Sequence, residues 1–206
     1  MNIINKFFKR FFDIIVSLIG IIILGIFLII ISIIIKCTSE GPVFFKQIRV
    51  GQSGKEFKIF KFRTMVVNAE SLGTQITIGK DKRITKIGHF LRKYKIDELP
   101  QLFNVFIGEM SFVGPRPEVP KYVAMYNETQ RKVLSVRPGI TDLASIRYRN
   151  ENEILGRAKN ADEAEDMYIN EIMPDKLKLN LEYIEKSNVF FDIYIIFKKV
   201  IYKFLF

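Results

Sequence analysis

Two adjacent carboxylates, Asp97 and Glu98, lie immediately before an apolar pattern with helical spacing that runs from Leu99 to Met110. Asp97 stands where a helix N-cap is expected, and Pro100 falls in the first helical turn, where its missing N–H costs nothing. The N–H groups of a helix N-terminus favour an anion, so a phosphate there would meet an ionised Asp97. That arrangement is what an aspartyl-phosphate nucleophile requires. The pair therefore predicts either phosphoryl-transfer chemistry or, more simply, a capped core helix with Glu98 in water.

Several cations could neutralise a phosphate beside this pair. Lys61 and Arg63 stand at the end of an expected strand, and Arg116 follows the carboxylates in Gly114-Pro115-Arg116-Pro117. The turn Arg137-Pro138-Gly139-Ile140-Thr141 could place an arginine and backbone N–H groups near a ligand. A solvated strand face explains Lys61 and Arg63 almost as well, and Pro-Gly turns are common. Each of these motifs is weak on its own.

Composition narrows the classes of partner. The chain has 206 residues, with 32 Lys and Arg against 22 Asp and Glu, which gives a formal net charge of +10. Such a charge favours anionic partners, and 49% hydrophobic residues with 19 Phe favour a membrane surface over nucleic acid. The single Cys37 excludes an internal disulfide and is most simply an idle thiol. The single His89 gives little support to histidine-based metal or nucleophile sites.

An uncharged run over residues 14–35 follows an amphipathic, Phe-rich and basic entry at residues 6–12. Its length as a helix is about 33 Å, enough to cross the apolar core of a bilayer. The run has neither the short apolar region nor the cleavage site of a signal peptide, so we expect it to be retained. Because both flanks are basic, the positive-inside rule gives no orientation. A spanning helix and a re-entrant hairpin with a break near Gly20 or Gly25 both remain open.

The other elements must position the candidate residues. A short hairpin with one basic face is expected from strands at 43–45 and 57–62, joined by a turn at 51–54. A polar loop is expected at 66–82, helices at 84–94, 119–133 and 174–184, and a surface helix or loop at 149–166. The apolar tail at 190–206 is interrupted by lysines, which is typical of an amphipathic helix lying in a membrane interface.

A series of sequence blocks now points to a family. In chain order the blocks are Lys9-Arg10-Phe11-Phe12-Asp13, Gly41-Pro42-Val43-Phe44-Phe45-Lys46-Gln47, Lys61-Phe62-Arg63-Thr64-Met65, Asp97-Glu98-Leu99-Pro100-Gln101-Leu102-Phe103-Asn104-Val105, Gly108-Glu109-Met110-Ser111-Phe112-Val113-Gly114-Pro115-Arg116-Pro117 and Arg137-Pro138-Gly139-Ile140-Thr141. Together they resemble the bacterial sugar transferase family of small monotopic phosphoglycosyl transferases. The resemblance covers nearly the whole chain.

The resemblance implies a reaction. A UDP-sugar gives its sugar-1-phosphate to a polyprenol phosphate, normally undecaprenyl phosphate, and UMP is released in this first membrane step of surface glycan assembly. Asp97 would be the nucleophile that forms a covalent phosphosugar intermediate, with Glu98 in positioning or proton handling. The family requires Mg²⁺, for which Asp97 is the expected ligand. The expected substrate-binding residues are Lys61, Arg63, Arg116, Arg137, Pro138 and Thr141.

The resemblance also implies an architecture and a location. We expect an α+β fold with a re-entrant membrane helix at 1–37, a cytosolic catalytic domain of short helices around a β-hairpin at 38–189, and an amphipathic membrane-interface helix at 190–206. The family's re-entrant helix usually breaks at a Ser-Pro pair, and here Gly25-Ile26 stands at that place. The protein would lie in the bacterial inner membrane, with its globular part on the cytosolic face.

Two points stay open at the level of sequence. Many family members continue Gly-Trp-Ala-Gln after the Pro-Gly turn, whereas this chain has Asp142-Leu143-Ala144-Ser145, which indicates a subgroup of unspecified sugar preference. The main alternative function is a non-catalytic, basic membrane-anchored scaffold or lipid-binding protein, in which Asp97 is only a cap. In either case the lipid bilayer is an expected partner, nucleic acid is not, and an oligomer is compatible with the sequence.

Overall fold

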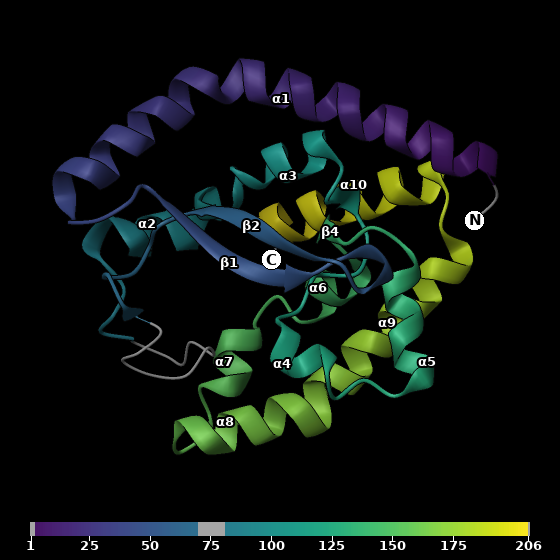
Figure 1. Ribbon diagram of the computed structural model, residues 1–206. Helices are drawn as coiled ribbons and strands as arrows, with labels where there is room; N and C mark the ends of the chain where they lie inside the picture. The colour runs from purple at the N-terminus through teal and green to yellow at the C-terminus, as the bar shows by residue number, and fades with distance from the viewer. Residues whose placement is uncertain (1–2, 70–80, 206) are drawn as a thin grey trace.

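The computed structural model describes residues 3–69 and 81–205, with helices arranged around two small β-sheets (Figure 1). The helices are α1 (Ile3–Thr38), α2 (Lys86–Tyr94), α3 (Gln101–Ile107), α4 (Pro120–Val123), α5 (Glu128–Arg131), α6 (Leu143–Arg147), α7 (Glu151–Leu155), α8 (Ala161–Met167), α9 (Met173–Lys186) and α10 (Val189–Leu205). The strands are β1 (Phe44–Val50), β2 (Glu56–Phe62), β3 (Ser111–Val113) and β4 (Gly139–Thr141). This confirms a mixed α and β fold with a long N-terminal helix.

Helix α1 is continuous from Ile3 to Thr38 and arches along one side of the molecule (Figure 1). The break expected at Gly25-Ile26 is therefore wrong for this structure. A glycine inside a helix costs only about 1 kcal/mol relative to alanine and removes no hydrogen bond, whereas proline would remove one. The curvature in Figure 1 is of the kind that long helices adopt when one side packs on a core.

One side of α1 packs on the rest of the protein along most of its length. Near the start, Arg10 donates to the carbonyls of Val105 (2.7 Å) and Phe106 (2.8 Å), and Asp13 accepts from the hydroxyl of Ser111 (3.0 Å). Towards its end, Leu28, Ile31 and Ile35 form a buried cluster with Phe62 and Leu91.

The opposite side of α1 is apolar and exposed. Its most exposed large side chains between the two ends include Ile22, Ile23, Ile26, Ile29 and Ile33. An 18-residue window of α1 has a mean hydropathy of 3.5 and only 17% of it is buried. By length and composition, α1 is able to cross a membrane, and in the described part of the chain it is the one helix that qualifies.

Strands β1 and β2 form the expected antiparallel hairpin, with Phe44 opposite Phe62 and Val50 opposite Glu56. β1 is longer than the three residues that the sequence indicated. The chain reverses through a 3-10 turn at Gln52–Gly54, where Gly54 has a φ of 75° that glycine adopts without strain. Inward-facing residues of β2 pack on α3, so the hairpin provides the platform for the residues that follow it.

The Gly-Pro-Arg-Pro and Arg-Pro-Gly blocks meet at a short parallel sheet, which the sequence did not predict. The segment expected to be only a turn contains β4, and β4 pairs with β3 so that Ser111 faces Gly139 and Val113 faces Thr141. Gly114 donates to the carbonyl of Thr141 at 3.0 Å. A Cβ at Gly139 would lie 2.1 Å from the backbone nitrogen of Gly114, so this close approach requires glycine.

We expect Gly139→Ala to lower the free energy of unfolding by more than about 3 kcal/mol, because backbone atoms of Gly114 cannot yield as a flexible side chain would. Thermal unfolding of the detergent-solubilised protein measures this. Gly25→Ala is the control: no atom lies within 4 Å of the place that its added methyl group would take, so its unfolding midpoint should stay the same or rise slightly. Equal midpoints for the two variants would contradict the close approach.

The bounds of several helices differ from those predicted from the sequence. The helix expected at 119–133 is divided into α4 and α5, because Asn127 caps the second helix in a reciprocal capping box with Gln130. The helix expected at 84–94 is confirmed as α2, the one at 174–184 lies within α9, and the segment 149–166 forms α7 and most of α8. In the polar loop expected at 66–82, residues 70–80 lie outside the described residues.

Helix α10 is not a detached tail. Ile195 is fully buried with Val113 and Tyr183, and Asp192 accepts a hydrogen bond from the hydroxyl of Tyr183 at 2.7 Å. Lys9 of α1 forms an ion pair with the same Asp192. The first turns of α1 and of α10 therefore contact each other, and both helices contact β3. Figure 1 shows α10 lying below the N-terminal part of α1.

Candidate active site

The carboxylate pair lies in a 3-10 turn between two helices. Lys95 ends α2 in the left-handed conformation (φ 58°), and the turn Ile96–Glu98 follows at once. α3 begins only after Pro100, which acts as its N-cap without a side-chain hydrogen bond. The expectation that Asp97 is the N-cap of this helix is therefore wrong. The sharp bend at Lys95 turns both carboxylates towards residues from other elements.

Glu98 is held between two cations that are distant in the sequence. Its Oε1 lies 2.6 Å from a guanidinium nitrogen of Arg116 and 3.3 Å from Nζ of Lys61, and the Glu98 side chain is only 12% exposed. Burial alone would raise the pKa of Glu98, but the charges of Arg116 and Lys61 outweigh burial and hold that pKa well below its usual value. A carboxylate held in this way between two cations favours the positioning role of Glu98 over proton handling.

Asp97 has a different environment from its neighbour. The residue is 8% exposed, and its Oδ1 is buried without a hydrogen-bond donor among the described residues. Burial, and then the charge of Glu98, raise the pKa of Asp97, although Lys61, Lys95 and Arg92 oppose that shift. A desolvated carboxylate oxygen that the protein leaves unsatisfied is suited to attack an electrophile or to bind a cation.

An open cleft of about 950 Å³ surrounds this pair, which is enough for a nucleotide sugar. Asp97 and Glu98 both line it, and its described walls carry nine positive side chains against six negative ones, the pair included. The cations that line the cleft are Arg49, Lys61, Arg92, Lys93, Lys95, Arg116, Arg149, Lys176 and Lys199. An anionic substrate is the ligand that this lining favours.

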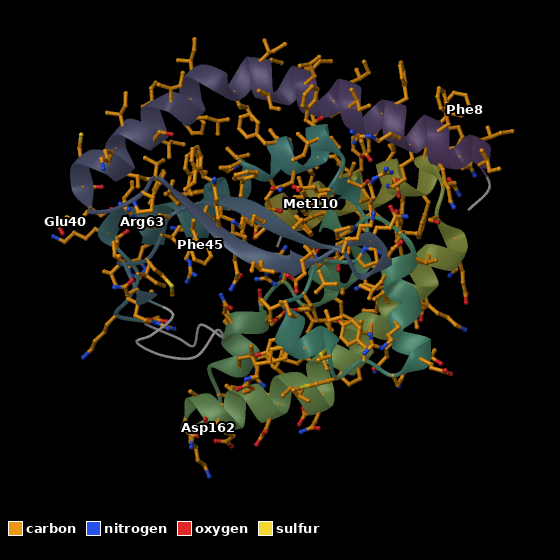
Figure 2. All side chains as sticks on the ribbon, viewed as in Figure 1. Phe8, Glu40, Phe45, Arg63, Met110 and Asp162 are labelled. Atoms are coloured by element: carbon orange, nitrogen blue, oxygen red, sulfur yellow. The ribbon has the colours of Figure 1, made fainter. Side chains whose placement is uncertain are left out.

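The structure brings together four of the residues expected from the sequence, Asp97, Glu98, Lys61 and Arg116. Arg63 lies instead beside the C-terminal end of α1, where it donates to the carbonyl and hydroxyl of Ser39, both at 2.8 Å (Figure 2). β2 ends at Phe62. The alternation of side chains along the strand therefore does not extend to Arg63, and its side chain points away from the cleft.

Of the block from Arg137 to Thr141, Ile140 is the one member among the described residues that line the cleft. Nε of Arg137 donates to the carbonyl of Gly108 at 2.9 Å, and the carbonyl of Pro138 accepts from the Ser111 N–H at 2.8 Å. Thr141 is buried at the end of β4. Arg63, Arg137, Pro138 and Thr141 are not among the described residues that line the cleft, so direct substrate contact by these four stays a prediction.

Arg49 and Lys199 are among the cleft residues that sequence reasoning missed. Arg49 of β1 donates to the carbonyl of Pro117 at 2.9 Å and faces the cleft beside Arg116. Lys199 of α10 also lines the cleft, although the tail lysines were interpreted as interfacial. The helical spacing of Lys199 from the buried Ile195 is the signal that could have identified it.

A metal ion would depend on the substrate for most of its ligands. Within residues 3–69 and 81–205 no group of three or more His, Cys, Asp or Glu side chains is arranged to hold a metal ion. Mg²⁺ is commonly bound by one or two carboxylates together with waters and substrate phosphates. The unsatisfied Oδ1 of Asp97 fits that mode, whereas Glu98 is already engaged by Arg116 and Lys61.

A small α and β domain with a long apolar helix and a cationic cleft around two carboxylates fits a membrane-associated protein that handles phosphorylated compounds. The chain belongs to the bacterial sugar transferase family, whose model matches residues 4–205. The comparison thereby confirms the family that the sequence blocks indicated.

Named relatives are similar over almost all of this chain. A UDP-glucose:undecaprenyl-phosphate glucose-1-phosphate transferase of Klebsiella pneumoniae is 38% identical over 97% of this chain and 41% of its own length. A UDP-N-acetylgalactosamine-undecaprenyl-phosphate N-acetylgalactosaminephosphotransferase of Aeromonas hydrophila is 35% identical over 96% of this chain and 44% of its own. The chain thus spans about two fifths of the length of these relatives, and the two relatives differ in the sugar that their names give.

Proposed function

We propose that this protein transfers a sugar-1-phosphate from a UDP-sugar to undecaprenyl phosphate or a similar polyprenol phosphate, with release of UMP. The observation that carries the proposal is the buried Oδ1 of Asp97, which has no donor among the described residues and lines a cationic cleft. Burying a carboxylate oxygen without a hydrogen-bond donor lowers the stability of the protein. Neither a helix cap nor a non-catalytic scaffold requires such an oxygen. The names of the relatives support the same class of reaction.

In the first half of the reaction, an oxygen of Asp97 attacks the phosphorus that bears the sugar. The bond from that phosphorus to the oxygen bridging the two phosphates breaks, UMP leaves with the bond electrons, and an acyl phosphate links Asp97 to the sugar. In the second half, a phosphate oxygen of the polyprenol phosphate attacks the same phosphorus, and the carboxylate of Asp97 is released. Covalent catalysis of this kind divides one difficult displacement into two easier ones.

Arg116 and Lys61 supply positive charge to the phosphates, and Glu98 holds both cations in place. Fixed charges in a partly desolvated cleft stabilise a charged transition state without having to reorganise. Asp97 would also hold Mg²⁺, which when bound neutralises phosphate charge and makes the phosphorus more electrophilic. A carboxylate could otherwise not approach a doubly charged phosphate without strong repulsion.

We further propose that the exposed apolar sides of α1 and α10 place the protein on the cytosolic face of the bacterial inner membrane. The continuous, curved α1 would insert its exposed apolar side into the bilayer and keep both of its ends on the same side. The segment 38–189 would form the catalytic domain, and 190–206 would lie at the interface. Contacts with α3 and β3 near the start of α1, and with β2 and α2 near its end, support this arrangement, because they keep both ends of the helix near one domain.

A donor panel tests the proposed function. UDP-glucose, UDP-galactose and UDP-N-acetylgalactosamine are supplied with undecaprenyl phosphate and Mg²⁺, and UMP release is measured. We expect release from at least one donor, a loss of about 100-fold or more when EDTA removes Mg²⁺, and recovery when excess Mg²⁺ is added back. Release that is unaffected by EDTA would contradict the metal requirement. If the three donors give no release, the panel is extended to further UDP-sugars, and no release from any of them by folded protein in lipid would contradict the reaction.

A further inference from the structure

Lys199 reaches the cleft because of the way in which α10 is fixed to the domain. Asp192, Ile195 and Lys199 are spaced by three and four residues, so they lie along one side of the helix. Asp192 is bound by Tyr183 and Lys9, and Ile195 is fully buried against the core. The next position on that side, Lys199, lines the cleft that contains Asp97.

The cleft surrounds Lys199 with other cations. Burial, and next the charge of Arg116, lower the pKa of Lys199, while Glu98 and Asp142 partly oppose the shift. No salt bridge within 4.0 Å joins Lys199 to a carboxylate of any residue that the structure describes, although Lys61, Arg116 and Lys176 each have one. An anion bound between Lys199 and Arg116 would relieve this repulsion.

The outer side of α10 indicates where that anion comes from. Phe190, Tyr194, Phe197 and Ile201 are exposed and apolar on this helix. A helix that faces an aqueous cleft on one side and exposes apolar side chains on the other is typical of helices that lie in a membrane interface. Lys198, the neighbour of Lys199, lies over the ring of Tyr194 with Nζ 5.5 Å from the ring centre, so the two lysines have different surroundings.

We infer that Lys199 binds the phosphate of the lipid-linked acceptor and that α10 thereby connects the cleft to the membrane surface. Lys199 is then a specificity-determining residue for the second substrate, in addition to the residues that surround Asp97. The inference rests on the proposed function, since it assigns the acceptor of that reaction.

Binding of a water-soluble acceptor analogue tests the inference without turnover. Farnesyl phosphate and, separately, UDP are titrated calorimetrically into the full chain in detergent, using wild type, Lys199→Met, Lys199→Arg and Lys198→Met. We expect Lys199→Met to weaken farnesyl phosphate binding by about tenfold, as is typical when a charge-assisted hydrogen bond is lost. Lys199→Arg should recover most of the affinity, and Lys198→Met should bind as wild type does. UDP affinity should stay within about twofold in every variant.

Four results would each overturn the assignment of Lys199. They are an unchanged farnesyl phosphate affinity in Lys199→Met, the same loss in Lys198→Met, a loss for UDP as large as that for farnesyl phosphate, and no binding of farnesyl phosphate to wild type. Steady-state kinetics with undecaprenyl phosphate then distinguish the role of Lys199 from the proposed function. An active wild type with an unchanged acceptor KM in Lys199→Met refutes the role of Lys199 alone, whereas a wild type inactive with every donor refutes the proposed function.

Discussion

Asp97→Asn should reduce UMP release by at least about 1,000-fold, because an amide is not a nucleophile at phosphorus and the residual rate reflects binding and electrostatics alone. The replacement preserves the size of the side chain, so the cleft and its cations should remain. Mass spectrometry of wild type mixed with a UDP-sugar in the absence of acceptor should detect a phosphosugar adduct on the peptide that contains Asp97. The variant should carry no adduct.

The stability of this variant separates a catalytic role from a structural one. The pKa of Asp97 is raised in the folded protein, so its ionised form is disfavoured there relative to the unfolded chain. As the pH rises above about 3.9, the pKa of an aspartate in the unfolded chain, ionisation of Asp97 therefore lowers the free energy of unfolding. The decrease is complete once the pH is above the pKa of Asp97 in the folded protein. At neutral pH we expect Asp97→Asn to unfold at the same temperature as wild type or a higher one.

Asp162→Asn is the matched control for this test. Asp162 lies in the first turn of α8, away from α3 and the hairpin (Figure 2), and it is not among the described residues that line the cleft. It should retain wild-type UMP release. Normal turnover by Asp97→Asn would contradict its role as nucleophile and would favour the non-catalytic alternative or a different nucleophile. A large loss of stability in Asp97→Asn would instead indicate a structural role.

Glu98→Gln should be the most destabilising single change in the site. The substitution leaves Arg116 and Lys61 in the cleft without the carboxylate that lies between them, and breaking a buried ion pair from one side costs about 3 kcal/mol or more. Because both cations lose their fixed positions, UMP release should fall by about 100-fold as well. Chemical denaturation and steady-state kinetics on the same preparations measure the two effects.

The pH dependence of stability gives a second readout for Glu98. Its folded pKa is depressed, so its contribution is fully present above the unfolded value of about 4.3 and is lost as the pH falls through the folded pKa. Wild type should therefore lose stability relative to Glu98→Gln as the solution is acidified below about pH 4.3. The control is Glu165→Gln, which breaks a more exposed pair with Lys121 and should cost at most about 1 kcal/mol. Equal costs for the two substitutions would contradict the cluster around Glu98.

Elements with local signals could be predicted from the sequence. The apolar run, the hairpin with its Gly-containing turn, and α2 all follow from periodicity and turn chemistry within short segments. For Asp97 and Glu98, the residues alone left phosphoryl transfer and a simple helix cap both open. Only the family blocks favoured a reaction at this pair.

Which charged residues share the cleft depends on contacts between segments far apart in the chain. The parallel pairing of β3 with β4 joins segments separated by the helices α4 and α5, and pairing at that distance leaves no periodic signal in either strand. The same pairing holds Arg137 at the carbonyl of Gly108, while the end of β2 turns Arg63 towards Ser39. Lys199 enters the cleft because Asp192 and Ile195 fix the rotation of α10. Whether a lysine faces lipid, water or a phosphate depends on such long-range packing, which composition and spacing cannot specify.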